Sequence, residues 1–218
     1  MVKKRPIYDK PECVTMSHGT KITNNNKKMG KYVSSVSRST DSCPKDAPCR
    51  LENGGTCYIG NMKPSVRASY QHNEDLILSD DKLVFLDVCE YIDMYAPKYF
   101  RWFVGGDIGS IEFLDGIVTV AERYPSIQFL VFTKWYSIVE DYIQEDDIPG
   151  NLHIRMSVWK DYGPSADLLE RFGGAYYDDG TPECRIPSKA YVCPDDCEKC
   201  HYKCFRANNR FNVVFPKH

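Results

Sequence analysis

The stretch "IEFLDGIVTVAERYPSIQFLVFT" (111–133) contains both building blocks of the fold in one run. Residues 111–125 place apolar side chains at helical spacing, and the predicted helix ends at Pro125 because proline cannot continue it. Residues 127–133 follow at once as a short apolar and aromatic run, which is typical of a buried strand. A helix followed directly by a buried strand predicts one unit of a parallel β/α sheet.

The same alternation extends in both directions from this stretch. Further helices are predicted at 78–96, 137–145 and 165–173, and further strands at 31–37, 98–104, 152–159, 175–179 and 190–194. About six strands are too few for the eight of a full (β/α)8 barrel, which leaves a partial barrel or an open doubly wound sheet. We predict an α/β fold with a partial (β/α) barrel of about six mostly parallel strands.

The chain of 218 residues is long enough for one main domain with appendages. We predict a basic polar arm at 1–30, the partial barrel at 31–183 and a Cys-rich metal-binding segment packed on the barrel at 184–218. Residues 1–38 carry nine Lys and Arg against two Asp and Glu, so the charge of this end is near +7 and that of the remainder near −9. Such an arm can contact nucleic acid or a host protein, or can be simply solvated.

The N-terminus "MVKKRPIYDK" is charged and no apolar run follows it, so neither a signal peptide nor a membrane span is predicted. We therefore expect a cytoplasmic protein without membrane contact. In a reducing compartment clustered cysteines bind metal more often than they form disulfides, whereas an extracellular location would favour disulfides.

Four cysteines near the end of the chain follow the spacing C-x3-C-x2-C-x3-C in "VCPDDCEKCHYKCF": Cys193, Cys197, Cys200 and Cys204. Zinc sites are usually built from two separated pairs of ligands, whereas compact runs with gaps of two and three residues wrap iron–sulfur clusters. This run predicts a 4Fe–4S cluster, with zinc as the alternative.

Three earlier cysteines, Cys43, Cys49 and Cys57, follow the first predicted strand with the wider spacing C-x5-C-x7-C. Three thiolates can hold three irons of a cluster and leave the fourth iron open to a small ligand. Cys184 either closes this site or is spare. Ordinary loop cysteines are the alternative.

Two further predicted strands end in polar or flexible residues. Gly105, Gly106 and Asp107 end the strand at 98–104, and Lys134 ends the strand at 127–133. Parallel β/α proteins bind ligands at the carboxyl ends of their strands, so we predict that these residues line a ligand pocket and that both cysteine groups open onto the same face. A strand-ending turn with a helix N-cap explains the same glycines and aspartate without a ligand.

Five segments in this order give the chain a resemblance to the phage gene product 88 family: "SCPKDAPCRLENGGTCY" (42–58), "FRWFVGGDIGS" (100–110), "YPSIQFLVFTK" (124–134), "YVCPDDCEKCHYKCF" (191–205) and "NVVFPKH" (212–218). The resemblance covers roughly residues 30–218 and implies a phage or prophage origin, hence the host cytoplasm, and a metal-binding β/α protein.

The chain also shows a more distant similarity to radical S-adenosylmethionine enzymes. Those enzymes have a partial β/α barrel, three cysteines after the first strand and a GGE-like motif where "GGD" (105–107) stands here. Their C-x3-C-x2-C spacing is absent from this position. The similarity implies an open iron that binds S-adenosylmethionine; the open site alone also allows a sulfur species. The alternative function is a zinc-stabilised protein that binds nucleic acid or a host factor without catalysis.

Overall fold

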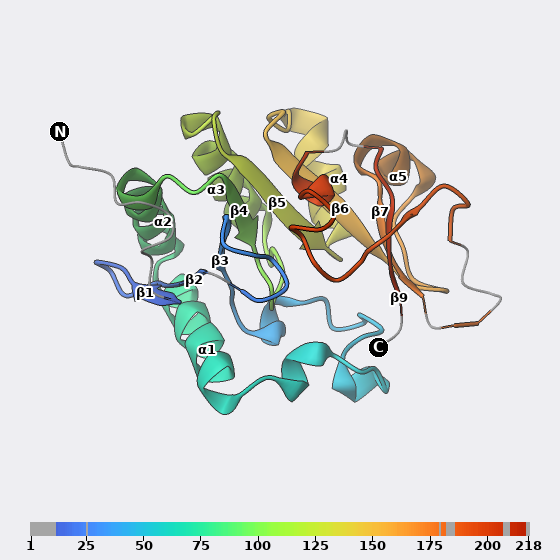
Figure 1. The fold of residues 1–218 in the computed structure, drawn as a ribbon, viewed down its shortest axis with the longest axis horizontal. Helices are drawn as coiled ribbons and strands as arrows, with labels where there is room; N and C mark the ends of the chain where they lie inside the picture. Colours follow the sequence, from blue (N-terminus) through green and yellow to red (C-terminus); the bar gives the residue numbers. More distant parts are fainter. Residues whose placement is uncertain (1–11, 25, 179, 182–185, 207–209, 217–218) are drawn as a thin grey trace.

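The computed structural model describes residues 12–24, 26–178, 180–181, 186–206 and 210–216. Within them the chain forms a mixed α/β fold with a nine-stranded sheet and five α-helices (Figure 1). The strands are β1 (Cys13–Thr15), β2 (Lys21–Asn24), β3 (Val33–Val36), β4 (Tyr99–Trp102), β5 (Gln128–Thr133), β6 (Leu152–Val158), β7 (Gly174–Asp178), β8 (Tyr191–Val192) and β9 (Val213–Pro216). The helices are α1 (Pro64–Ser79), α2 (Asp81–Tyr95), α3 (Ile111–Arg123), α4 (Tyr136–Glu145) and α5 (Ala166–Phe172).

The strand order is β1-β2-β3-β4-β5-β6-β7-β9-β8. Pairing is parallel from β3 onward, and β1, β2 and β3 pair antiparallel. The central strands follow one another in chain order, as expected when each helix returns the chain to the next position of a parallel sheet. Among the described strands β1 and β8 stand at the two ends of this order, so closure into a barrel is not shown.

The prediction of about six strands was too low for two reasons. Strands β1 and β2 form a hairpin at residues 13–24, inside the segment expected to be a polar arm. Strand β9 lies between β7 and β8, so the end of the chain adds a strand. Helix α1 was also missed, because its buried residues include the polar Asn73 and Glu74 and its apolar pattern is weak.

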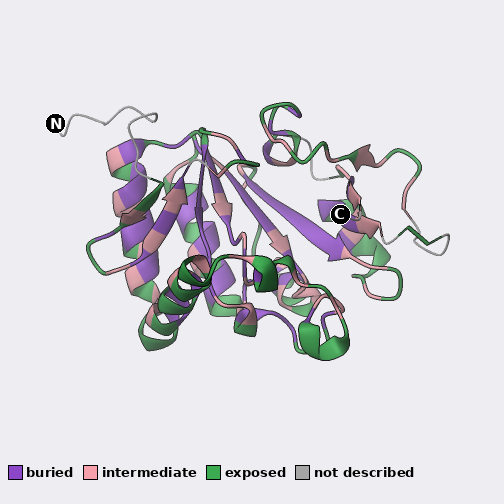
Figure 2. Cartoon of the chain, turned by 60° about the horizontal axis from the view of Figure 1, so that its bottom comes forward, coloured by how far each residue is buried: buried purple, intermediate pink, exposed green. Residues whose placement is uncertain are grey.

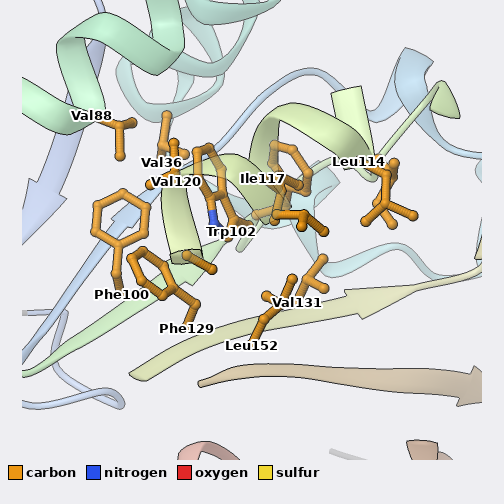
Figure 3. Close-up of a cluster of buried hydrophobic side chains, with 14 of the residues drawn as sticks. Val36, Val88, Phe100, Trp102, Leu114, Ile117, Val120, Phe129, Val131 and Leu152 are labelled. Atoms are coloured by element: carbon orange, nitrogen blue, oxygen red, sulfur yellow. The ribbon is translucent and has the colours of Figure 1, made fainter. Parts of the chain in front are cut away.

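The helices cover one face of the sheet (Figure 1). In β4 and β5, Phe100, Trp102, Phe129 and Val131 point into the core on this side (Figure 3). Helix α3 contributes an apolar stripe to the same core, and the Ser110 hydroxyl caps its first turn by accepting a hydrogen bond from Phe113 N. We call this the helix-side core.

The opposite face of the sheet is covered by the C-terminal segment. Alternate residues of the central strands, including Val33, Tyr99 and Leu130, pack with Met29, Tyr202 and Phe205 in a second buried cluster. In Figure 1 the orange-to-red C-terminal chain crosses the sheet on the side away from α3, α4 and α5. We call this side the second face.

No described helix combines the length and the apolar character that a membrane span requires.

Candidate functional site: two thiol groups at the sheet

The structure places the predicted cysteines in two groups. Cys43, Cys49 and Cys57, the first thiol group, lie in the loop that follows β3, and Cys193, Cys197, Cys200 and Cys204, the second thiol group, lie between β8 and β9. All nine described cysteines are free thiols. Cys184 lies outside the described residues.

The loop of the first thiol group is fastened to the carboxyl ends of β4 and β5. Asp107 N donates a hydrogen bond to Ser42 Oγ at 2.9 Å, and Trp135 Nε1 donates to Ser42 O at 2.7 Å. The Tyr58 hydroxyl, next to Cys57, donates to Val104 O. The group therefore occupies the edge of the sheet at which β/α proteins hold their ligands.

Asp107 and Lys134 form a buried ion pair at the centre of this edge. Lys134 Nζ lies 2.9 Å from Asp107 Oδ2, and the carboxylate side chain is fully buried. Its oxygens also accept hydrogen bonds from Thr133 Oγ1 at 2.6 Å and from Ile108 N and Lys134 N at 2.9 Å. Asp107 thus joins the end of β4 to the end of β5.

The ion pair and the first thiols influence one another electrostatically. Burial raises the pKa of Cys43 to about 12; the Lys134 cation opposes this rise, and Asp107, Cys49 and Cys57 add to it. Burial also raises the pKa of Cys49, and the Lys134 cation again opposes this rise. Burial alone would lower the pKa of Lys134, but Asp107, Cys43 and Cys49 outweigh it and raise that pKa. The side chains are therefore close neighbours, and any thiolate formed here faces Lys134.

The two predicted pocket glycines are packed against protein groups. A Cβ atom on Gly105 would stand 2.7 Å from the Tyr70 ring, and one on Gly106 would stand 2.8 Å from Arg38 O. Gly106 also has a φ angle of +87°, which side chains rarely adopt. These contacts account for a glycine at both positions of the turn between β4 and α3. Their role in a ligand pocket stays a prediction.

The second thiol group is wrapped in a loop with tight backbone turns. Its peptide nitrogens are bonded to neighbouring segments, with Cys193 N donating to Val214 O and Cys197 N to Lys28 O, both at 2.9 Å. Asp195, His201 and Tyr202 adopt left-handed φ angles of 58°, 53° and 58°. Such angles are unusual for residues other than glycine. Of the five non-glycine residues described with a positive φ angle, three lie in this loop.

Two arginines on the second face lie beside these thiols. Burial raises the pKa of Cys204 to about 12, and the cations of Arg155 and Arg101 oppose the rise. For Cys197, burial and the neighbouring Cys200 raise the pKa to about 12, and Arg101 opposes them. Burial also raises the pKa of Cys193, to which Cys200 contributes. The four thiols therefore lie within electrostatic reach of one another and of two guanidinium groups.

Sequence reasoning did not identify Arg101 and Arg155. Both occupy strand positions that face away from the helix-side core: Arg101 lies over the Phe132 ring at 4.8 Å, and Arg155 donates from Nη1 to Phe172 O at 2.6 Å. The signal was an arginine inside an otherwise apolar strand, in "FRWFV" and in "LHIRMSV". A charged side chain in a buried strand is costly unless it is hydrogen-bonded or paired with an opposite charge.

Arg101 acts electrostatically on both thiol groups or on their neighbours. Its guanidinium opposes the rise that desolvation causes in the pKa of Tyr58, the neighbour of Cys57, and it acts in the same direction on Cys197 and Cys204. The first group lies at the carboxyl ends of the strands, while Cys197 and Cys204 pack against the second-face cluster. Among the described residues, no three Cys, His, Asp or Glu side chains are grouped closely enough to hold a single metal ion.

An open pocket of about 400 Å³ lies beside the loop of the first thiol group. Its walls come from Asp46 and Pro48 of that loop, from the turn after β6 and from Tyr177 of β7. In Figure 2 the connecting segments on the near side of the molecule are largely exposed, in contrast to the buried strands behind them.

The family model described as gene product 88 matches residues 13–183. This range includes the hairpin of β1 and β2 and the first thiol group, and it ends before the second thiol group. No curated protein and no solved structure matches the chain.

Proposed function

The chain belongs to the gene product 88 family of phage gene products, and from this premise and its two thiol groups we propose that it is a phage-type iron–sulfur protein. The second thiol group is the proposed site of a 4Fe–4S cluster, with Cys193, Cys197, Cys200 and Cys204 as ligands. The sheet with its helices on one face is, in this proposal, a partial (β/α) barrel whose inner side is the second face.

The observation that carries the proposal is the mutual electrostatic influence of four free thiols in one short, tightly turned loop. Cys193, Cys197 and Cys204 resist ionisation, because burial and neighbouring thiolates raise their pKa values. A cluster removes this penalty, since its iron atoms bind the thiolates directly. Arg101 and Arg155 support the same proposal, because a cluster with four thiolates carries net negative charge that guanidinium groups stabilise.

The first thiol group is the proposed second or shared site. Three thiolates from Cys43, Cys49 and Cys57 leave one iron of a cluster open, and the ligand of that iron would be a small molecule such as S-adenosylmethionine or a sulfur species. Lys134 supports this proposal as a cation beside Cys43 and Cys49. Cys184 is the alternative fourth ligand.

The test is anaerobic purification followed by visible absorption and by analysis of iron, acid-labile sulfide and zinc. A brown protein with about four iron and four sulfide per chain supports one cluster, and about twice that content supports two. The double variant Cys197→Ser/Cys204→Ser should lose the iron of the second group. Cys13→Ser, on an exposed strand of the hairpin, is the matched control and should keep it.

One observation favours a second candidate, a zinc-stabilised binding protein. Cys197 and Cys204 pack against the apolar second-face cluster, so a metal there would fasten the C-terminal segment to the sheet without any reaction. The basic N-terminal region would then contact nucleic acid or a host factor. Colourless protein with stoichiometric zinc in the second group would contradict the iron–sulfur proposal and support this one.

A further inference from the structure

The open pocket beside the first thiol group has a fixed frame. Trp159 and Tyr162 pair their backbones, with Trp159 N donating to Tyr162 O at 2.8 Å and Tyr162 N donating to Trp159 O at 3.4 Å. This pairing closes a turn with Lys160 and Asp161 at its tip and sets the two rings edge to face, with centroids 6.2 Å apart. The rings are therefore positioned before any ligand arrives, which lowers the entropy cost of binding.

A second set of contacts joins this turn to the rest of the site. The Tyr162 ring packs on Tyr136 with centroids 5.4 Å apart, and the Tyr162 hydroxyl donates to Asp46 Oδ1 at 3.3 Å. Tyr136 in turn donates its hydroxyl to Ser157 O. The pocket lies where β6 and β7 end, so it occupies a ligand position of the fold.

The lining of the pocket combines aromatic rings with carboxylates. Trp159, Tyr162 and Tyr177 provide rings, and Asp46 and Asp161 provide two negative charges against the single positive charge of Lys160. Ring faces attract cations through their quadrupole, and tryptophan does so most strongly. Carboxylates add to this attraction and repel phosphates and other anions.

We propose that this pocket binds a small organic cation of the quaternary-ammonium class. The chemistry that recognises it is an aromatic wall at Trp159, Tyr162 and Tyr177 with acidic groups at Asp46 and Asp161. A quaternary ammonium ion is weakly hydrated and has no hydrogen-bond donor on nitrogen, so it loses little when it leaves water for the ring faces. A pocket of about 400 Å³ accommodates a molecule of this size.

The proposal is independent of any metal in the thiol groups, since none of the residues that carry it is a cysteine. Asp46 lies between Cys43 and Cys49 in the chain, so a bound cation would stand next to the first thiol group.

The test is a calorimetric titration of the full chain with choline and with its uncharged carbon isostere, 3,3-dimethylbutanol. Choline should bind at least about tenfold more tightly, because only the charge distinguishes the two probes. Trp159→Leu should weaken choline binding by about tenfold. Equal binding of the two probes would overturn the proposal, as would tighter binding of adenosine, a neutral ring compound, than of choline.

Two exposed residues of opposite charge at the rim of the pocket provide a control. Asp161→Asn should weaken choline binding about threefold and Lys160→Ala should strengthen it by a similar factor, because each changes one charge at the rim of the pocket. Both residues lie in an exposed turn, and urea unfolding of each variant checks that its fold is intact. The absence of opposite effects would show that the pocket does not select a cation.

Discussion

The two thiol groups differ in how their surroundings hold them. The first group is part of a hydrogen-bonded edge in which one carboxylate, Asp107, balances the Lys134 cation and ties two strand ends together. The second group sits in a loop of tight turns that contacts the sheet through Cys193 N and through side chains such as Tyr202 and Phe205. The comparison teaches that a buried ion pair and its hydrogen bonds hold the first group, whereas backbone turns and apolar packing hold the second, to which the proposed metal would add a further constraint.

The largest expected effect concerns the frame of the first group. Asp107→Ala removes the partner of a buried ammonium and three further hydrogen bonds to the carboxylate, so the free energy of unfolding should fall by about 3–5 kcal/mol. Urea denaturation measures this loss. Asp147→Ala is the matched control, because that aspartate is fully exposed and its substitution should cost less than about 0.5 kcal/mol. A similar loss of free energy in both variants would contradict the stabilising role of the Asp107–Lys134 pair.

The next prediction concerns the order of the second group. In protein purified with its metal, Cys197→Ser/Cys204→Ser should raise amide hydrogen exchange across residues 197–206 by at least about tenfold, because the loop would lose the constraint that the proposed metal supplies. Hydrogen-exchange mass spectrometry resolves this segment. Cys43→Ser/Cys49→Ser should leave exchange at 197–206 unchanged. If the two double variants behave alike, the contrast between the groups is wrong.

Alkaline pH gives a prediction for metal-free protein. The thiols of Cys43, Cys197 and Cys204 ionise near 9.0 in the unfolded chain and at a pKa of about 12 in the folded chain. Above pH 9 the unfolded state releases these protons first, so stability is complete below pH 9 and falls as the pH rises toward 12. Urea titrations at several pH values measure the slope. Cys43→Ala should reduce the slope of the free energy of unfolding against pH. An unchanged slope would show that Cys43 does not contribute to it.

A smaller effect distinguishes the cation of the first group. Lys134 lowers the pKa of Cys43, so Lys134→Met should raise that pKa and reduce the thiolate fraction at pH 8. Alkylation of Cys43 in metal-free protein should therefore slow by about tenfold, which corresponds to one pKa unit. Alkylation of Cys204, which faces Arg101 and Arg155, should keep its rate. Equal slowing of both cysteines would indicate a general change of structure.

The smallest effect concerns the surface contact of the second group. Lys28 Nζ lies 2.6 Å from Asp195 Oδ2, and both side chains are largely exposed. Lys28→Ala should lower the free energy of unfolding by less than about 1 kcal/mol, since surface ion pairs are screened by water and salt. A larger loss, or one that persists at high salt, would show that this pair orders the loop.

The sequence determined the repeating part of the fold. Helix α3, strand β5 and strand β6 were predicted within a residue or two, because their apolar spacing is strong and their ends carry proline or capping residues. It also determined that the cysteines form two groups, one after β3 and one after β8. A loop that follows a strand of a parallel sheet starts at the carboxyl end of that strand.

Only the tertiary structure decided what surrounds those groups. The polar residues Asn73 and Glu74 anchor α1 by bonding to the chain near Lys21 and to Arg38, which no apolar pattern can reveal. Arg101 and Arg155 reach the second thiol group because strand alternation turns them to the face that the end of the chain covers. Local spacing specifies elements within a few residues, whereas contacts between distant segments depend on how the sheet brings them together.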